Sequence, residues 1–292
     1  MGAVAPFDYD QAFAANLGLL SADEQARLRR ATIAIPGMGG VGGAYLLTLT
    51  RLGIERFAIA DGDTFELRNF NRQVGASLQT VGRAKTEAMA EMARAINPSV
   101  SIRVSPEGIH PRNIDPFLAD CDLVLDGLDF FAIEARRLLF AHARARGLTV
   151  ITCGPVGFGA ALLIFTPEGP SFDEFMDLRD GLGYEEQVAR FAVGLAPAGL
   201  HVPYLDPSSV NLKTRRGPSA PMAIDLCAGL VGVEAMSLLL KRRPAWAVPR
   251  YTQFDAYRQR YHRGILRGGN RHPLQRLKLS YIKRRFLHDI PA

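Results

Sequence analysis

The sequence has few cysteines and no long apolar run free of charge. Three of the 292 residues are cysteines, Cys121, Cys153 and Cys227, and no two of them form a C-x-x-C pair. This scarcity excludes a disulfide framework and gives no sign of a structural zinc site. No apolar run free of charge reaches the roughly 18–20 residues of a membrane span. The first residues, MGAVAPFDYDQ, lack the basic and apolar regions of a signal peptide. We therefore predict a globular protein of the cytoplasm with no membrane partner.

A general excess of positive charge is also missing. The net charge of +6 at pH 7 is confined to residues 267–292, which hold seven Lys or Arg and a single acid, Asp289. A nucleic-acid-binding domain needs a basic surface on its folded body. We therefore predict that nucleic acid is not a partner. The histidines are scattered along the chain and indicate no metal site.

Short β-branched segments alternate with segments of helical length in the first half of the chain. This alternation is typical of a parallel sheet that helices cover on both faces. It predicts a Rossmann-like, doubly wound α/β fold with a mostly parallel sheet. The predicted strands are residues 32–36, 56–60, 100–104, 122–126, 148–152 and 160–165, and the predicted helices are 40–52, 82–96 and 131–146.

The second half of the chain changes in character. Residues 167–221 are rich in Pro, Gly, Asp and Ser, with only short apolar pieces, and are too long for an ordinary connection. We predict a long crossover insertion that covers a site. Residues 223–240 are apolar nearly all round, but Asp225 and Glu234 lie within them, so they predict a buried core helix and not a membrane span.

A glycine-rich motif follows the first predicted strand. The run IAIPGMGGVGG places Gly37, Gly39 and Gly42 in the pattern G-x-G-x-x-G at the start of a helix. Glycines there let a phosphate approach the backbone N–H groups at the helix N-terminus. Asp61 ends the second strand near the offset of about 20 residues at which a carboxylate meets a ribose hydroxyl. Its presence weighs against a glycine turn that binds nothing and predicts a nucleotide site.

Polar and cationic side chains follow the second strand. The segment DGDTFELRNFNRQ carries Asn69, Arg72 and Gln73, and Lys85 begins the next helix. An enzyme that cleaves ATP between the α and β phosphates needs fixed cations, because charge develops on the α-phosphoryl oxygens and on the departing pyrophosphate. A dinucleotide oxidoreductase has no need of this cluster. The sequence therefore favours ATP as the nucleotide.

The motifs occur in an order that resembles a known family. The runs GMGGVG, ADGDTFELRNFNRQ, GRAKTEAMAEMARAINPSV and LVLDGLDFF match the adenylating domain of the ThiF/MoeB/HesA group, in the ubiquitin-activating-enzyme-like superfamily. The resemblance is strongest over residues 24–166, and SFDEF, VGLAPAGLHVPYLDPSS, QFDAYRQRYH and GGNRHPLQRLK are similar to a bacterial subgroup of ThiF-family adenylyltransferases. It implies transfer of AMP from ATP to a carboxylate, with Mg²⁺, by a homodimer.

The resemblance also implies roles for individual residues. The glycines would cradle the nucleotide, Asp61 would hold the ribose, and Arg72, Gln73 and Lys85 would contact phosphates. The implied nucleotide-binding residues are Gly37, Gly39, Gly40, Gly42, Asp61, Asp63, Asn69, Arg72, Gln73 and Lys85.

A carboxylate after the fourth predicted strand completes the implied site. Asp129 would help to hold Mg²⁺, and independently of the resemblance a carboxylate at the carboxyl end of such a strand faces the ligand crevice. Asp126 is a weaker candidate, because it should still lie within the strand. The implied catalytic residues are Arg72, Lys85 and Asp129.

The sequence departs from the family pattern at three places. Ala15 stands where many members carry an arginine that reaches the partner subunit's site, and Phe130 replaces an asparagine that often follows the catalytic aspartate. The zinc-binding cysteine pairs of many relatives are absent. Ala14 and Ala15 keep a catalytically weak nucleotide-binding partner protein open as an alternative. An NAD-dependent oxidoreductase is a second alternative, which the glycine motif and Asp61 would serve equally well.

The carboxylate that receives AMP would belong to the C-terminus of a small carrier protein or peptide, or to a small acid.

The chain is predicted to divide into four segments with different tasks. The segments are an N-terminal helical arm at residues 1–30, the ATP-binding adenylation domain at 31–166, the covering segment at 167–221, and a buried helix with a basic C-terminal extension, completing the same domain, at 222–292.

Overall fold

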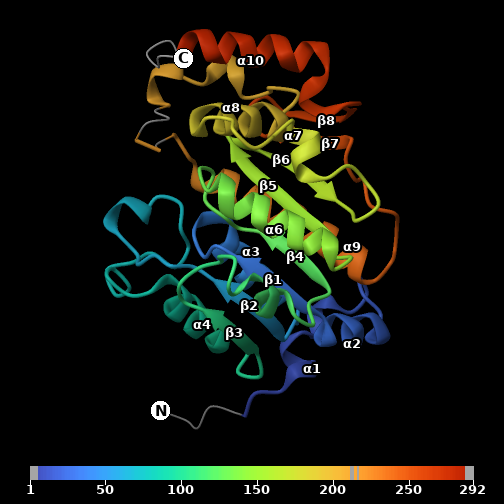
Figure 1. Cartoon of the computed structure of the whole chain (residues 1–292). Helices are drawn as coiled ribbons and strands as arrows, with labels where there is room; N and C mark the ends of the chain where they lie inside the picture. Colours follow the sequence, from blue (N-terminus) through green and yellow to red (C-terminus); the bar gives the residue numbers. More distant parts are fainter. Residues whose placement is uncertain (1–5, 211–213, 216, 287–292) are drawn as a thin grey trace.

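An eight-stranded sheet forms the centre of the computed structural model, which describes residues 6–210, 214–215 and 217–286 (Figure 1). The strand order is β3-β2-β1-β4-β5-β6-β7-β8; neighbours from β3 to β5 pair parallel, and those from β5 to β8 pair antiparallel. This mostly parallel α/β architecture confirms the predicted fold class. The strands are β1 (Thr32–Pro36), β2 (Arg56–Ala60), β3 (Ser101–Ser105), β4 (Leu123–Asp126), β5 (Val150–Val156), β6 (Gly159–Phe165), β7 (Arg250–Asp255) and β8 (Arg260–Ile265).

Helices cover both faces of the sheet. One face packs against α2 (Ala22–Arg30), α3 (Gly40–Arg51), α4 (Lys85–Ile96) and α9 (Pro221–Leu239). The other face packs against α5 (Ile114–Leu118), α6 (Ile133–Ala145), α7 (Phe172–Met176) and α8 (Tyr184–Leu195). The remaining helices are the short α1 (Tyr9–Ala12) and the C-terminal α10 (Pro273–Phe286), which packs on α8.

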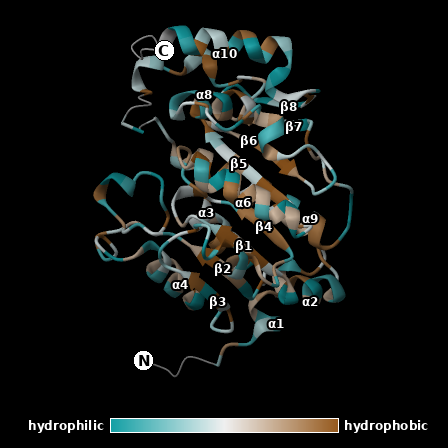
Figure 2. Cartoon of the chain, viewed as in Figure 1, coloured by the Kyte–Doolittle hydropathy of each residue, from teal (hydrophilic) through white to brown (hydrophobic). Residues whose placement is uncertain are grey.

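The alternation of side chains along each strand separates two apolar cores. In β1, Ile33 and Ile35 belong to the core under α3, whereas Ala34 belongs to the core on the opposite face. Successive side chains of a strand point to opposite faces, so continuous apolar runs suit strands that are buried on both sides. Figure 2 accordingly shows the central strands as mostly hydrophobic.

The structure corrects the expectation for the second half of the chain. Residues 167–221 do not form only an irregular covering segment, because α7 and α8 lie within them and place Phe175, Val188 and Phe191 in the core. The C-terminal part likewise contains the hairpin β7–β8, which the sequence analysis missed. Helix α4 begins at Lys85, and Gly82 lies in a turn with a φ of 84°.

Helix α9 is the apolar helix that the sequence predicted, but only one side of it is buried. Ile224, Cys227 and Val231 pack against the core, whereas Met222 and Val233 are half exposed. Among the described residues, α9 is the one helix whose length and hydropathy would also fit a membrane span, and 44% of that window is buried. Core helices of soluble proteins meet the same criterion, so length and hydropathy do not decide where α9 belongs.

Candidate active site

Three glycines let two loops touch at the carboxyl end of β1. Gly37 has a φ of 91°, and a side chain there would overlap the carbonyl of Gly127, in the loop after β4. A side chain on Gly42 would overlap the carbonyl of Gly37. Gly127 was not predicted, because only the fold brings it to the motif. This contact leaves the N-terminus of the 12-residue helix α3 open at Gly39 and Gly40, where the first N–H groups have no partner within the helix.

Asp61 fixes the glycine loop to the end of β2. One carboxylate oxygen of Asp61 accepts the Met38 N–H at 2.6 Å, and the other accepts the Asp63 N–H at 2.8 Å. Burial raises the pKa of Asp61, although nearby Lys85 opposes the shift. The predicted ribose-binding residue therefore stands directly beside the loop, with one lone pair on each oxygen left for a ligand.

Lys85 lies at the start of α4 with its side chain buried. Its ammonium contacts the carboxylate of Asp63 at 2.9 Å, and its backbone N–H donates to the Asp63 carbonyl. The Asp63 side chain is 75% exposed, so this ion pair faces the open edge of the site. An ammonium group has three N–H donors. Two of these remain for a phosphate.

The loop between β2 and α4 brings Asn69, Arg72 and Gln73 to the same edge. Asn69 is buried, and its side-chain oxygen accepts the Glu66 N–H, so it shapes the loop. Gln73 is also buried; its amide nitrogen lies 3.5 Å from where a side chain on Gly39 would begin, and its Oε1 has no hydrogen-bond partner among the residues that the structure describes. A buried acceptor without a partner, directly under a helix N-terminus, marks a place that a polar ligand can complete.

Arg72 differs from most arginines around it. Its guanidinium donates to the Arg68 carbonyl at 2.8 Å and to the Asn71 side chain at 3.0 Å. It forms no ion pair with an acidic side chain in the described part of the chain. Its positive charge is thus available to an anionic ligand.

The turn after β4 presents Asp129 to solvent. Asp129 accepts the Phe131 N–H at 2.9 Å through one carboxylate oxygen, and the other oxygen is not engaged within the described residues. Asp126, by contrast, ends β4 and is buried, where it accepts from Arg136 and from Thr152 at 2.8 Å each. The structure therefore supports Asp129 over Asp126 as the carboxylate that can meet a ligand.

Arg136 fixes the turn that carries Asp129 through hydrogen bonds, a role that the sequence analysis missed. Its buried guanidinium donates to the carboxylate of Asp126 and to the carbonyls of Leu128, Asp129 and Phe130. These contacts fix the backbone that carries Asp129. Spacing alone could not reveal this role, because Arg136 lies within an ordinary amphipathic helix.

Two further residues flank Asp129 from later parts of the chain. The hydroxyl of Tyr184 donates to the Phe131 carbonyl, and the guanidinium of Arg215 lies 4.7 Å from the centre of the Tyr184 ring. Burial raises the pKa of Tyr184, Arg215 opposes this shift, and Asp129 adds to it. Phe130, the second departure from the family pattern, packs against Phe131 and Phe191. The segment before α9 thus brings a cation near Asp129.

Metal ligands are few at this site. No group of three or more His, Cys, Asp or Glu side chains gathers anywhere in residues 6–210, 214–215 or 217–286 in a way that could hold a metal ion. Mg²⁺ usually binds through one or two carboxylates together with substrate phosphates and waters. A single exposed carboxylate such as Asp129 fits that mode of binding.

All three cysteine side chains are buried. Burial raises the pKa of Cys121 to about 11 and that of Cys227 well above its usual range. Cys153, on β5, is 2% exposed. A thiol must reach its partner as the thiolate to act as a nucleophile, so none of the three is placed for a thioester.

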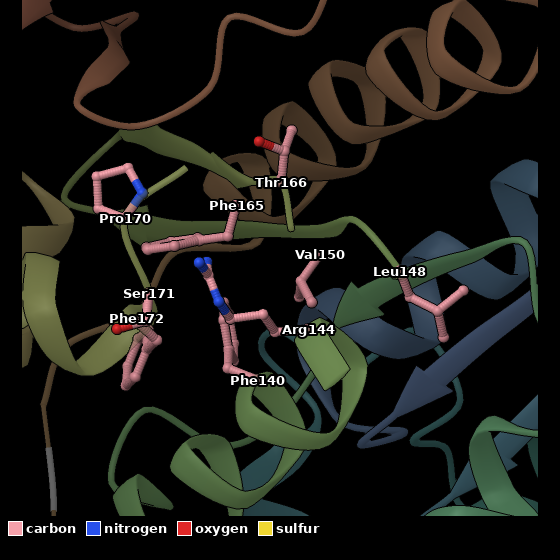
Figure 3. A pocket seen from close by; sticks show the side chains of 9 residues that line it. All are labelled: Phe140, Arg144, Leu148, Val150, Phe165, Thr166, Pro170, Ser171 and Phe172. Carbon is pink, nitrogen blue, oxygen red and sulfur yellow. The ribbon is translucent and has the colours of Figure 1, made fainter. Parts of the chain in front are cut away.

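A small pocket lies at the opposite end of the sheet from the glycine loop (Figure 3). It is lined by Phe140 and Arg144 of α6 and by residues at the start of β5 and the end of β6. Its volume of about 10 Å³ holds no more than one water. It is therefore a packing defect and not a second nucleotide site.

Ala15 lies far from the glycine loop of its own chain. It is exposed in a short 3₁₀ helix (Ala14–Asn16), and Asn16 donates to the carbonyl of Leu52, at the C-terminal end of α3. The glycine loop is at the other end of α3, and 12 residues of helix span about 18 Å. A longer side chain at position 15 could not reach the site of its own chain.

The chain is similar in sequence to a known protein family. The model of the ThiF family matches residues 12–276. The chain is 34% identical over 151 residues to the tRNA threonylcarbamoyladenosine dehydratase of Haemophilus influenzae, covering 51% of this chain and 57% of that protein. It is 28% identical over 148 residues to the sulfur carrier protein ThiS adenylyltransferase of Escherichia coli, covering 51% and 58%. The chain thus spans somewhat more than half the length of these two relatives.

The fold is also similar to that of a solved structure. A crystal structure of PaaA superposes with a TM-score of 0.67 at 22% identity, covering 91% of this chain and 85% of that one. This likeness shows a shared fold, and the family match itself extends over most of the sequence. The chain belongs to the ThiF family.

Proposed function

We propose that this protein transfers AMP from ATP to a carboxylate and releases pyrophosphate. The observation that carries the proposal is the grouping at the carboxyl ends of β1, β2 and β4: an open helix N-terminus, the unpaired guanidinium of Arg72, buried Lys85 and exposed Asp129. The partnerless Oε1 of Gln73 beside Gly39 fits a bound polar ligand. A relative named as an adenylyltransferase supports the same reaction.

The chemistry asks for charge stabilisation more than for a base. A substrate carboxylate is ionised at neutral pH, so one of its oxygens can attack the α-phosphorus directly, while the bond between that phosphorus and the bridging oxygen of pyrophosphate breaks. Arg72 and Lys85 would stabilise the charge that grows on the phosphate oxygens. Mg²⁺, held by Asp129 and phosphate oxygens, would neutralise further negative charge. Asp61 would orient the ribose, and Asp63 would hold Lys85 in place.

We infer that the substrate carboxylate belongs to a small carrier protein or a peptide. A relative named for the sulfur carrier protein ThiS supports this choice. Because the three thiols are buried, the acyl-adenylate would pass directly to an external or substrate-borne nucleophile without an enzyme thioester. The cytoplasm remains the proposed compartment, and the predicted division into arm, adenylation domain, covering segment and extension remains a proposal.

Nucleotide preference tests the proposal most directly. We expect isothermal titration calorimetry to show binding of ATP with Mg²⁺ and no comparable binding of NAD, because Arg72 and Lys85 face phosphates that NAD lacks at that position. ATP–pyrophosphate exchange with candidate carboxylates then separates an enzyme from a nucleotide-binding partner protein. The partner protein is the alternative that Ala15 favours. Preferential binding of NAD would contradict the proposal. ATP binding without exchange for any carrier or peptide tested would favour the partner protein.

We further propose a two-fold homodimer. Two groups of exposed apolar side chains lie on segments named above: Leu17 and Leu19 directly after Ala15, and Leu67, Val74 and Leu78 on the loop that carries Arg72. In a two-fold dimer the Leu17–Leu19 patch of one subunit could cover the Leu67–Leu78 patch of the other, and the same contact would repeat in reverse. This arrangement would place position 15 of one subunit near Arg72 of its partner, where an arginine could reach the phosphates.

The dimer leads to two expected results. Light scattering should give twice the monomer mass of 31.9 kDa, and Leu78→Asp should shift the protein towards the monomer, because it buries a charge in the interface. Val104→Asp, at an exposed position on β3, is the matched control. In the dimer, Ala15→Arg should raise pyrophosphate exchange. A monomer at every concentration would contradict the dimer. If Ala15→Arg exchanges pyrophosphate no faster than the wild type, the placement of residue 15 near the partner's site is wrong.

A further inference from the structure

The C-terminal helix α10 presents an uncovered apolar stripe. Leu274, Leu277 and Tyr281 are each more than 60% exposed. Their spacing of three and four residues puts them on one face of the helix. The opposite face is fixed to α8, because Leu279 packs on it and the side chain of Gln275 donates to the Val193 carbonyl. Figure 1 shows α10 at the edge of the molecule, with α8 beneath it.

Basic side chains border this stripe. The sequence of α10, PLQRLKLSYIKRRF, contains no acid. Arg276 and Arg284 are exposed and form no ion pair with any described residue, whereas Lys283 pairs with Glu186. The face of α10 is therefore both apolar and positively charged.

A hollow with two more arginines adjoins the start of α10. Arg267 and Arg271 line an open hollow of about 280 Å³ together with Glu174, Phe175 and Pro249. The backbone and side chain of Ser171 lower the pKa of Glu174, and the charge of Arg271 adds to this shift, so one acid offsets part of the positive charge of the hollow. Within the described part of the chain neither arginine forms an ion pair. Arg271 lines the hollow and precedes Leu274 by three residues, so the hollow adjoins the start of the stripe, and the two are taken together as one surface. We call it the α10 surface: Arg267, Arg271, Leu274, Leu277, Tyr281 and Arg284.

We propose that the α10 surface binds an acidic amphipathic helical segment of the substrate, at a distance from the carboxylate that is activated. An acidic helix with leucines at matching spacing would bury the stripe and pair with the arginines, as amphipathic helices do in apolar grooves. The stripe favours this occupant over RNA, because two of its three side chains are leucines and only Tyr281 offers a ring on which a base could stack. The small apolar area of the stripe favours a helical segment over a membrane surface.

The position of the surface restricts the class of substrate, on the basis of the proposed adenylation. Strand β8, next to the hollow, stands five strand spacings from β1 in the sheet, which is about 24 Å. About seven extended residues are needed to cover that distance. A small acid cannot occupy both places. The substrate is therefore a peptide or protein with a recognition segment at least this far from its reacting C-terminus.

A binding measurement without nucleotide tests the α10 surface separately from catalysis. The probe is a fluorescein-labelled synthetic 18-residue peptide with leucines on one helical face and glutamates on the flanks, compared by anisotropy with a scrambled peptide of the same composition. We expect at least tenfold tighter binding of the amphipathic peptide. Leu277→Asp and Arg271→Glu should each weaken it at least tenfold, and Val104→Asp should leave it unchanged.

The outcomes distinguish this proposal from the proposed function. Asp129→Ala should bind the peptide as the wild type does, so that a failure of pyrophosphate exchange leaves the binding result valid. Circular dichroism verifies that every variant folds, and unchanged ATP binding provides a second check for Leu277→Asp, Arg271→Glu and Val104→Asp. Equal binding of the scrambled peptide, or full binding by Leu277→Asp, would overturn the proposal. Tighter binding of a single-stranded RNA or of vesicles containing anionic lipid than of the peptide would assign the surface to that ligand and overturn it as well.

Discussion

Asp129→Ala is expected to lower ATP–pyrophosphate exchange at least about 100-fold, the usual scale for losing one charge-stabilising group. The carboxylate is exposed on the turn after β4, with one oxygen free for Mg²⁺ or water. Its removal should not unfold the protein, because the Asp129 contacts that hold Arg136 are made by the backbone carbonyl and not by the side chain. Asp180→Ala, which removes a carboxylate that is 97% exposed, is the matched control.

Arg72→Ala should have a comparable effect through the phosphates. Its guanidinium has no acidic partner among the described residues, so its loss removes positive charge from the site without leaving a buried anion. Arg68→Ala is the control, because that neighbouring side chain pairs with Glu66. Exchange rates measured beside circular dichroism spectra check both variants. Wild-type exchange in Asp129→Ala and Arg72→Ala together would rule out the assigned roles.

The sequence predicted the parallel half of the sheet well because each strand there is a short apolar run between turn residues. β1 and β2 begin and end at the predicted residues, and β3 differs by one residue. The hairpin β7–β8 escaped prediction because β8, RYHRGI, is an edge strand that carries two arginines and no apolar run, and it is mostly exposed. Helix α8 escaped because Gly and Pro residues on both sides of it resemble a long loop.

The candidate site also contains residues that the sequence could suggest and residues that only the structure reveals. The glycines, Asp61, Arg72, Gln73 and Lys85 could be proposed from the sequence because they lie in motifs with characteristic spacing. Gly127, Arg136 and Arg215 could not, because they reach the site through the packing of separate elements. A motif records which residues a ligand requires in one segment. The contacts that hold a turn in place are visible only after folding.

Arg136→Met is expected to destabilise the fold by about 3–5 kcal/mol, the usual cost of removing one partner of a buried ion pair. Asp126 would stay buried with only the Thr152 hydroxyl and the Leu128 N–H as donors, and its charge would lack compensation. Three carbonyls of the turn that carries Asp129 would lose their donor at the same time. We therefore expect pyrophosphate exchange to fall even at temperatures where the variant is folded.

Arg137→Met provides the matched control, one residue further along the same helix. Arg137 pairs with Asp173 and Asp180 at the surface, where an ion pair contributes about 0–1 kcal/mol. Urea denaturation followed by circular dichroism compares the two variants. Asp126→Asn combined with Arg136→Met should recover part of the lost stability, because the buried charge is gone, but should not recover exchange, because the turn still lacks its donor. Equal stability of the two single variants would show that Arg136 does not hold the turn.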